Sequence, residues 1–292
     1  HTTYPELKGG AFDLKVDHEN IIWGFDTNYR KLYAYKDGAL ETWETSNYTS
    51  VVDYTLFEAW DGKIVFLGKD SFYHIKNGAI EKYNVSGIED LQIYDALFAK
   101  NGLLWIADYR GGLYRINSDG TRELIDLTQY GSGSRRVSRL AEGPNSEVWA
   151  VTVDNEVAHM SAGTWTVYTN SMLSRSGQTR GIFGEESGAL WMGTEAGIYR
   201  LSGGRFDQVV EIGQVAPDHV FSIAKTPEGA LVYSTMNNGL KLLHKGSFET
   251  YSPRNGLKPG IARCVVADPT GGQLVGTTVG LNLILNGQVI DK

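Results

Sequence analysis

The sequence predicts an all-β fold, a seven-bladed β-propeller built from four-stranded antiparallel blades. Two unrelated markers each recur seven times with a period of about 42 residues. The first is the apolar residue that ends each stretch resembling G-x-L-W: Trp23, Val65, Trp105, Trp149, Trp191, Val232 and Val275. The second is the turn glycine before the last strand of each unit: Gly38, Gly78, Gly120, Gly163, Gly204, Gly246 and Gly287. Because both markers keep one period, the repeat runs through the whole chain.

The composition supports many short strands joined by tight turns. The 292 residues include 35 glycines, 16 tyrosines and 10 phenylalanines, but only seven prolines. Glycine supplies the turn conformations that other residues avoid, and aromatic residues are typical of strands. The chain is therefore expected to be all-β and soluble.

One unit shows how a blade is built. Within residues 179–210, strands are predicted at 180–184, 189–193, 198–202 and 205–210, separated by polar or glycine-containing turns. Both faces of such a sheet are apolar, so each blade must be covered by its neighbours. The tryptophans at the first marker are thus predicted to pack between blades.

The predicted organisation is a single domain over residues 1–292. Residues 1–8 are either a closing strand or the remnant of a preceding repeat, because residues 3–5 align with the end of an outer strand. The seven blades are expected at about 11–45, 51–88, 92–128, 135–170, 178–211, 218–252 and 261–292.

Charge and cysteine content exclude several functions. With 27 basic and 34 acidic residues, the formal net charge is -7, which repels phosphate backbones, so no nucleic acid partner is expected. The single cysteine, Cys264, excludes an internal disulfide and a cysteine-based metal site.

No apolar run approaches the roughly 20 residues that span a bilayer, so no membrane insertion by this segment is expected. The start at His1, without a leader, suggests a trimmed or processed segment.

Two stretches carry a resemblance to a known family. Residues 188–200 (GALWMGTEAGIYR) and 102–115 (GLLWIADYRGGLYR) resemble the repeat unit of two-component regulator propellers. The resemblance implies a bacterial sensory domain in the periplasm or outside the cell, which responds to glycan fragments and has signalling domains in the parent chain. Other units depart from the pattern, since valine replaces the tryptophan at positions 65, 232 and 275.

Propeller ligands bind near the loops that precede the first strand and follow the second strand of each blade. Arg136, Arg180 and Arg263 occupy nearly equivalent points there and could form a receptor for carboxylate or sulfate groups. The alternative is that each arginine pairs with a nearby acid or is solvated. Tyrosines could add flat surfaces for sugar rings. The predicted ligand-binding set is Arg110, Arg136, Arg180, Arg263, Asp108, Tyr109, Tyr94 and His219.

No catalytic constellation, metal site or cofactor site is predicted. The enzyme alternative is a metal-assisted lyase of the streptogramin-lyase type, in which His219 would be the base because it alone leads into a first strand. His74 and His159 share a third-strand position with Arg115 and Arg200, which indicates a structural role. Residues 131–134 are interpreted as a flexible linker rather than an anion site. A third hypothesis is a scaffold that binds a protein partner at a rim.

Overall fold

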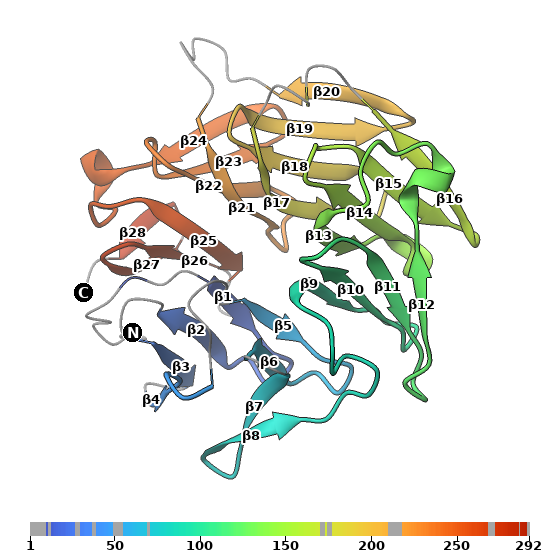
Figure 1. Cartoon of the computed structure of the whole chain (residues 1–292). Coiled ribbons are helices and arrows are strands. Elements are labelled where there is room, and N and C mark those ends of the chain that lie inside the picture. Colours follow the sequence, from blue (N-terminus) through green and yellow to red (C-terminus); the bar gives the residue numbers. More distant parts are fainter. Residues whose placement is uncertain are drawn as a thin grey trace. The chain divides into compact units, whose positions relative to one another are not determined.

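The computed structural model describes residues 10, 13–26, 30–36, 39–48, 55–68, 71–169, 173, 177–209, 218–267, 272–285 and 287–290. These residues form seven sheets, each of four consecutive antiparallel strands (Figure 1). The predicted fold class, a seven-bladed β-propeller with four strands in each blade, is confirmed. The helical elements of the described residues are short 3-10 turns, and no helix among them is long and apolar enough to cross a membrane.

The chain divides into two compact units, residues 1–83 with 221–292 and residues 84–220. The first unit contains blades 1, 2, 6 and 7, apart from Val220 at the start of blade 6, and the second contains blades 3, 4 and 5. The single domain over residues 1–292 stays a prediction.

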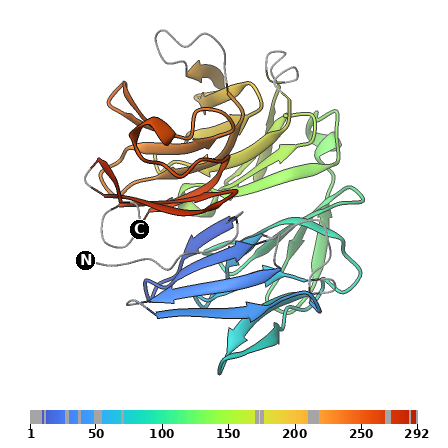
Figure 2. The same cartoon turned by 90° about the vertical axis from the view of Figure 1, so that its left-hand side faces the viewer.

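The strands of the first unit are short, as predicted. Blade 1 is β1 (Asp13–Val16), β2 (Ile22–Asp26), β3 (Lys31–Lys36) and β4 (Ala39–Glu44), drawn in blue as one sheet in Figure 2. Blade 2 is β5 (Leu56–Glu58), β6 (Ile64–Leu67), β7 (Phe72–Lys76) and β8 (Ala79–Tyr83). Blade 6 is β21 (Val220–Lys225), β22 (Leu231–Thr235), β23 (Leu240–His244) and β24 (Ser247–Tyr251). Blade 7 is β25 (Ala262–Ala267), β26 (Gln273–Thr277), β27 (Gly280–Leu285) and β28 (Gln288–Ile290).

The second unit is built in the same way. Blade 3 is β9 (Ile93–Phe98), β10 (Leu104–Asp108), β11 (Leu113–Ile116) and β12 (Arg122–Ile125). Blade 4 is β13 (Val137–Glu142), β14 (Val148–Thr152), β15 (Val157–Ser161) and β16 (Thr164–Tyr168). Blade 5 is β17 (Thr179–Gly184), β18 (Leu190–Thr194), β19 (Gly197–Ser202) and β20 (Arg205–Val209).

Within each unit the first strands of neighbouring blades lie against one another. In the second unit, β13 lies between β9 and β17, and in the first unit β1 contacts β5 and β25. Blade 7 ends with its own strand β28, and blade 1 begins with β1, so blades 7 and 1 pack together as two sheets of continuous chain. Residues 1–8, predicted as a closing strand or a remnant, lie outside the described residues.

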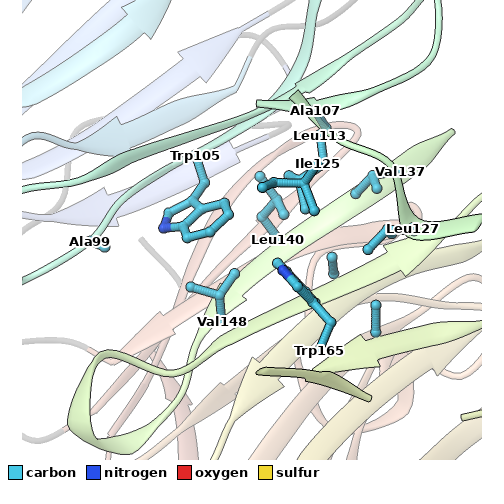
Figure 3. Close-up of a cluster of buried hydrophobic side chains, with 12 residues drawn as sticks. Ala99, Trp105, Ala107, Leu113, Ile125, Leu127, Val137, Leu140, Val148 and Trp165 are labelled. Atoms are coloured by element: carbon cyan, nitrogen blue, oxygen red, sulfur yellow. The ribbon is translucent and has the colours of Figure 1, made fainter. Parts of the chain in front are cut away.

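The space between two blades is filled by the predicted apolar residues. Between blades 3 and 4, Trp105 meets Trp165 edge-on with ring centroids 5.8 Å apart, and Val148 and Leu140 pack beside them (Figure 3). Between blades 4 and 5, Trp149 belongs to a similar buried cluster. Burying an aliphatic or aromatic side chain of this size contributes about 1.5–3 kcal/mol, so these clusters hold adjacent blades together.

A carboxylate strengthens the contact between first strands at two equivalent positions. In blade 3, Asp95 accepts hydrogen bonds from its neighbour Ala96 N (2.9 Å) and from Leu140 N of blade 4 (2.8 Å). In blade 1, Asp13 accepts in the same way from Leu14 N (2.8 Å) and Leu56 N of blade 2 (2.7 Å). Hydrogen bonds to an ionised group are stronger than neutral ones, so each aspartate fixes the register of two blades.

The turn glycines predicted from the repeat do adopt the conformation that requires glycine. All six that are described have φ between +74° and +83°. In several hairpins the preceding residue is left-handed too, as at Asn77 (φ 51°) and Ala162 (φ 50°). Two successive positive φ angles define a type I′ turn, which matches the twist of the strands that it joins.

The first marker is shifted by one residue in the last blade. In blade 5, Trp191 pairs with Arg200, three residues from the turn pair Thr194 and Gly197. In blade 7 the turn pair is Thr277 and Gly280, and counting back three residues leads to Leu274 rather than Val275. The apolar run at 274–275 hid this shift, because both residues are fully buried and either fits the pattern.

We expect the Gly163→Ala substitution to lower the free energy of unfolding by about 1 kcal/mol. A methyl group at Gly163 would meet no atom within 4 Å, so the cost comes from the backbone angle, φ 78°. The control is Gly133→Ala, since Gly133 is not left-handed and its added methyl group would make only ordinary contacts. Denaturant unfolding of both variants measures the difference, and equal losses would contradict the explanation.

Candidate functional site

The first strands carry a repeated β-bulge near their starting ends. In blades 3, 4, 5 and 7 the register with the second strand skips one residue: Tyr94, Ser138, Arg180 and Arg263. A bulge leaves its extra residue unpaired and redirects its side chain. We call the side of the blades where the first strand begins and the second strand ends the first-strand end.

The bulges refine the predicted row of arginines. Arg180 and Arg263 occupy the same bulge position, whereas Arg136 lies two residues before the bulge residue Ser138. Arg263 belongs to the other unit, where its guanidinium lies 4.4 Å from the ring centre of Phe221. Arg136 and Arg180 thus lie in the neighbouring blades 4 and 5 of one unit, whereas Arg263 lies in blade 7 of the other unit.

Two tyrosines and two arginines form a connected cluster at the first-strand end of blades 3 and 4. Tyr94 and Tyr109 stack with ring centres 5.9 Å apart. The guanidinium of Arg136 lies 5.5 Å from the ring centre of Tyr109, and that of Arg139 lies 5.5 Å from the ring centre of Tyr94. We call these four residues the tyrosine–arginine cluster. It presents two cations on flat aromatic surfaces.

The cations of the tyrosine–arginine cluster have no carboxylate partner in the part of the chain that the structure describes. Among the described residues, no carboxylate oxygen lies within 4.0 Å of the guanidinium of Arg136 or Arg139. Arg139 instead donates to two backbone carbonyls, those of Arg180 and Ser138, each at 2.6 Å. Arg136 is exposed, and Tyr109 is 52% exposed. An anion in solution can therefore reach both residues.

Arg139 was not among the predicted site residues. It pairs with Val151 beyond the bulge at Ser138, and without that bulge its side chain would be assigned to the opposite face of the strand. The sequence contains no sign of the bulge at this point.

Asp108 holds the loop that carries Tyr109. Its side chain is 3% exposed and its carboxylate accepts from Arg110 N at 2.7 Å and from Gln92 N at 3.0 Å. Tyr109 N donates to the carbonyl of Gln92 at 2.6 Å, which ties the same two segments together. The guanidinium of Arg110 donates to the carbonyl of Asp90 and lies 3.4 Å from the Asp108 carboxylate. Asp108 and Arg110 thus both hold the loop of Tyr109 in position.

A pocket of about 570 Å³ adjoins the cluster on the side of blade 5. Arg180 lies in its wall and pairs with Glu195 at 3.0 Å, so its charge is balanced there. Backbone bonds connect the pocket to the cluster, since Val153 N donates to the carbonyl of Arg136 at 2.9 Å. The lining residues are Val153, Asp154, Asn155, Gly177, Gln178, Arg180 and Glu195.

The loop at residues 131–134 binds a carboxylate from the same chain, that of Glu156. The carboxylate of Glu156 accepts from Ser132 Oγ at 2.5 Å and from Gly133 N at 2.8 Å. The loop follows a 3-10 turn, η1 (Leu127–Tyr130), and is anchored at both points. The groups that could bind an external anion are therefore used internally.

His159 has the structural role that the repeat predicted for it. His159 pairs with Trp149 in the position that Arg200 takes opposite Trp191, and its ring stacks on Trp149 at 3.6 Å. Its Nε2 lies 3.0 Å from Glu147, so it is part of the packing. His219 is half-buried just before β21. No three His, Cys, Asp or Glu residues are grouped as a metal ion requires within the described part of the chain.

Comparison with solved structures identifies propellers that have the same architecture. Virginiamycin B lyase from Staphylococcus aureus, in a catalytically inactive variant with quinupristin, has 17% sequence identity and a TM-score of 0.75. The match covers 98% of both chains. The likeness shows the fold. No family model matches the sequence, and no curated protein sequence matches it either.

Two further matches are extracellular domains of putative signalling systems from B. thetaiotaomicron. One belongs to a one-component system, with 16% identity and a TM-score of 0.75 over 97% of this chain and 39% of that chain. The other belongs to a hybrid two-component system, with 16% identity and a TM-score of 0.72 over 96% of this chain and 40% of that chain. This chain thus corresponds to about two fifths of those domains.

We expect Asp108→Ala to lower the free energy of unfolding by about 2 kcal/mol, because two part-buried amides, Gln92 N and Arg110 N, lose their charged acceptor. Asp154→Ala is the matched control, since Asp154 follows the second strand of blade 4 but is exposed. Urea unfolding of both variants gives the comparison. A loss in the Asp108 variant no larger than in the Asp154 variant would show that the loop does not depend on this carboxylate.

Proposed function

We propose that the chain is the ligand-binding propeller of a bacterial signalling protein, located outside the cytoplasm, and that it recognises a glycan fragment or small molecule with an anionic group. The observation that carries the proposal is the tyrosine–arginine cluster, in which Arg136 and Arg139 lie on aromatic rings without a carboxylate partner among the described residues. The likeness to extracellular domains of signalling systems supports the sensory role and the location.

The chemistry of the cluster suits a sugar acid. A guanidinium binds a carboxylate or sulfate through two parallel hydrogen bonds, and it keeps its charge at any physiological pH. An exposed tyrosine ring offers an apolar face to a sugar ring and a hydroxyl group to its polar edge. Tyr109 and Arg136 therefore present both kinds of contact side by side.

The proposal does not use four residues of the predicted ligand-binding set as direct ligand contacts: Arg110, Arg180, Asp108 and His219. Arg110 and Asp108 hold the loop of Tyr109, and Arg180 forms a wall of the adjoining pocket. Signalling domains elsewhere in the parent protein, or a protein partner at a rim, would receive the signal. No cofactor is part of the proposal.

A lyase is the second candidate, favoured by the likeness to virginiamycin B lyase over the whole chain. His219 would act as the base. Among the described residues, however, no carboxylate lies within 4.0 Å of its imidazole. Incubation with quinupristin separates the candidates: product formation that disappears in the His219→Ala variant would establish the lyase and displace the sensor proposal.

We expect α-1,4-digalacturonate to raise the melting temperature of the protein more than its neutral counterpart α-1,4-galactobiose does, because only the acid pairs with the guanidinium groups. The Arg136→Ala variant should bind the acid about tenfold more weakly, the loss of one charge-assisted hydrogen-bonded contact. The control is Arg205→Ala, since Arg205 is exposed on an outer strand and pairs with Asp207.

If no acidic or neutral oligosaccharide stabilises the protein near millimolar concentration, the ligand-binding proposal is wrong. The propeller would then belong with interaction scaffolds. Light scattering and pull-down with the parent protein's other domains would be the next measurements.

A further inference from the structure

The pocket between blades 4 and 5 has a rigid floor. Asn155 is 4% exposed, and its amide group donates to the carbonyl of Leu173 at 3.0 Å and to that of Gly177. The amide oxygen accepts from Thr179 N at 3.0 Å and from Thr179 Oγ1 at 2.7 Å. One buried side chain thus binds the loop after β14 to the segment before β17, and the pocket is formed before any ligand arrives.

Two of the three charged side chains that line the pocket are acidic, whereas the tyrosine–arginine cluster is cationic. Arg180 is paired with one oxygen of Glu195, so these two charges balance. Asp154 is exposed, and among the described residues it has no hydrogen bond or ion pair. Within the described residues, the lining therefore retains one uncompensated negative charge, together with the second oxygen of Glu195.

Among the described residues, no cation pairs with this negative charge. The side chain of Arg136 extends to the ring of Tyr109 in blade 3, although its backbone borders the pocket at Val153. The Glu195 carboxylate lies directly against Gly177, where any side chain would overlap it. Asp154 is exposed, whereas Glu195 is half-buried with one oxygen paired to Arg180, and no third metal-binding side chain joins them in the described ranges.

We propose that this pocket is a second binding site, which takes a small hydroxylated ligand carrying a protonated amine, with the amine between Asp154 and Glu195. Carboxylates accept the hydrogen bonds that an ammonium group must donate, and bonds between ionised groups are about twice as strong as neutral ones. The volume of about 570 Å³ lies within the range of small-molecule sites. The exposed amide of Gln178 offers a partner for hydroxyl groups. This site uses residues other than the tyrosine–arginine cluster, so it goes beyond the proposed function.

The test uses two disaccharides of matched shape, the β-1,4-linked glucosamine dimer and N,N′-diacetylchitobiose, in titration calorimetry at a pH below the pKa of the amines. We expect the glucosamine dimer to bind and the acetylated dimer, which has no charge, to bind at least about tenfold more weakly. Asp154→Asn and Glu195→Gln should each weaken binding of the glucosamine dimer by about tenfold. Asp154→Asn is expected to fold normally, because the side chain is exposed.

The matched control is Glu185→Gln. Glu185 pairs with Arg200 at 3.0 Å in the same blade but does not line the pocket, so this variant should bind as the parent does. Equal binding of the two disaccharides, unchanged binding in the Asp154→Asn variant, or no binding of the glucosamine dimer would each overturn the proposal. The Arg136→Ala variant should keep full amine binding, which separates this result from the test of the cluster.

Discussion

The side-by-side packing of first strands is the contact on which the rest of each unit depends. A blade is apolar on both faces, so it is stable only when neighbours cover it. At the inner edge, the carboxylate of Asp95 accepts two amide hydrogens, one from its own strand and one from the next blade at Leu140. These bonds fix the register of the two blades, and so they help to position the loops at the first-strand end.

The bulges convert this regular packing into a site. In an unbroken strand, side chains alternate between the two faces and would be covered by the next blade. The bulge at Tyr94 frees the ring of Tyr94 to stack on Tyr109. The bulge at Ser138 sets the position of Arg139, which lies over the ring of Tyr94. A cation over an exposed aromatic ring gains about 0.5–1 kcal/mol, enough to limit the motion of Arg136 over Tyr109, whereas Arg139 is also held by two backbone carbonyls.

The sequence predicted the features that depend on local chemistry. The six described turn glycines were found correctly because a positive φ excludes most other residues, and Trp105 and Trp149 were found because burial repeats with the blade. The sequence could not show the bulges, because a one-residue shift leaves the apolar pattern almost unchanged. For the same reason Arg139 was missed and Arg136 was aligned with Arg180.

The sequence offered pairing with an acid as an alternative for Arg180, but it did not identify which side chains pair. Glu195 balances Arg180, and Glu156 fills the loop at residues 131–134, through contacts that only the folded chain creates. The predicted site residues of blades 3, 4 and 5 lie near the first-strand end, while their charges are paired differently from the sequence prediction. The result is a cationic surface in blades 3 and 4 beside a pocket with acidic groups in blades 4 and 5.

The most direct measurement is amide hydrogen exchange by mass spectrometry with and without α-1,4-digalacturonate. A ligand held by the tyrosine–arginine cluster should slow exchange in residues 92–95, 108–111 and 135–139, and leave the hairpins at Gly120, Gly163 and Gly204 unchanged. Slower exchange confined to those hairpins, or no change in the three segments at saturating ligand, would contradict a binding site at the first-strand end of these blades.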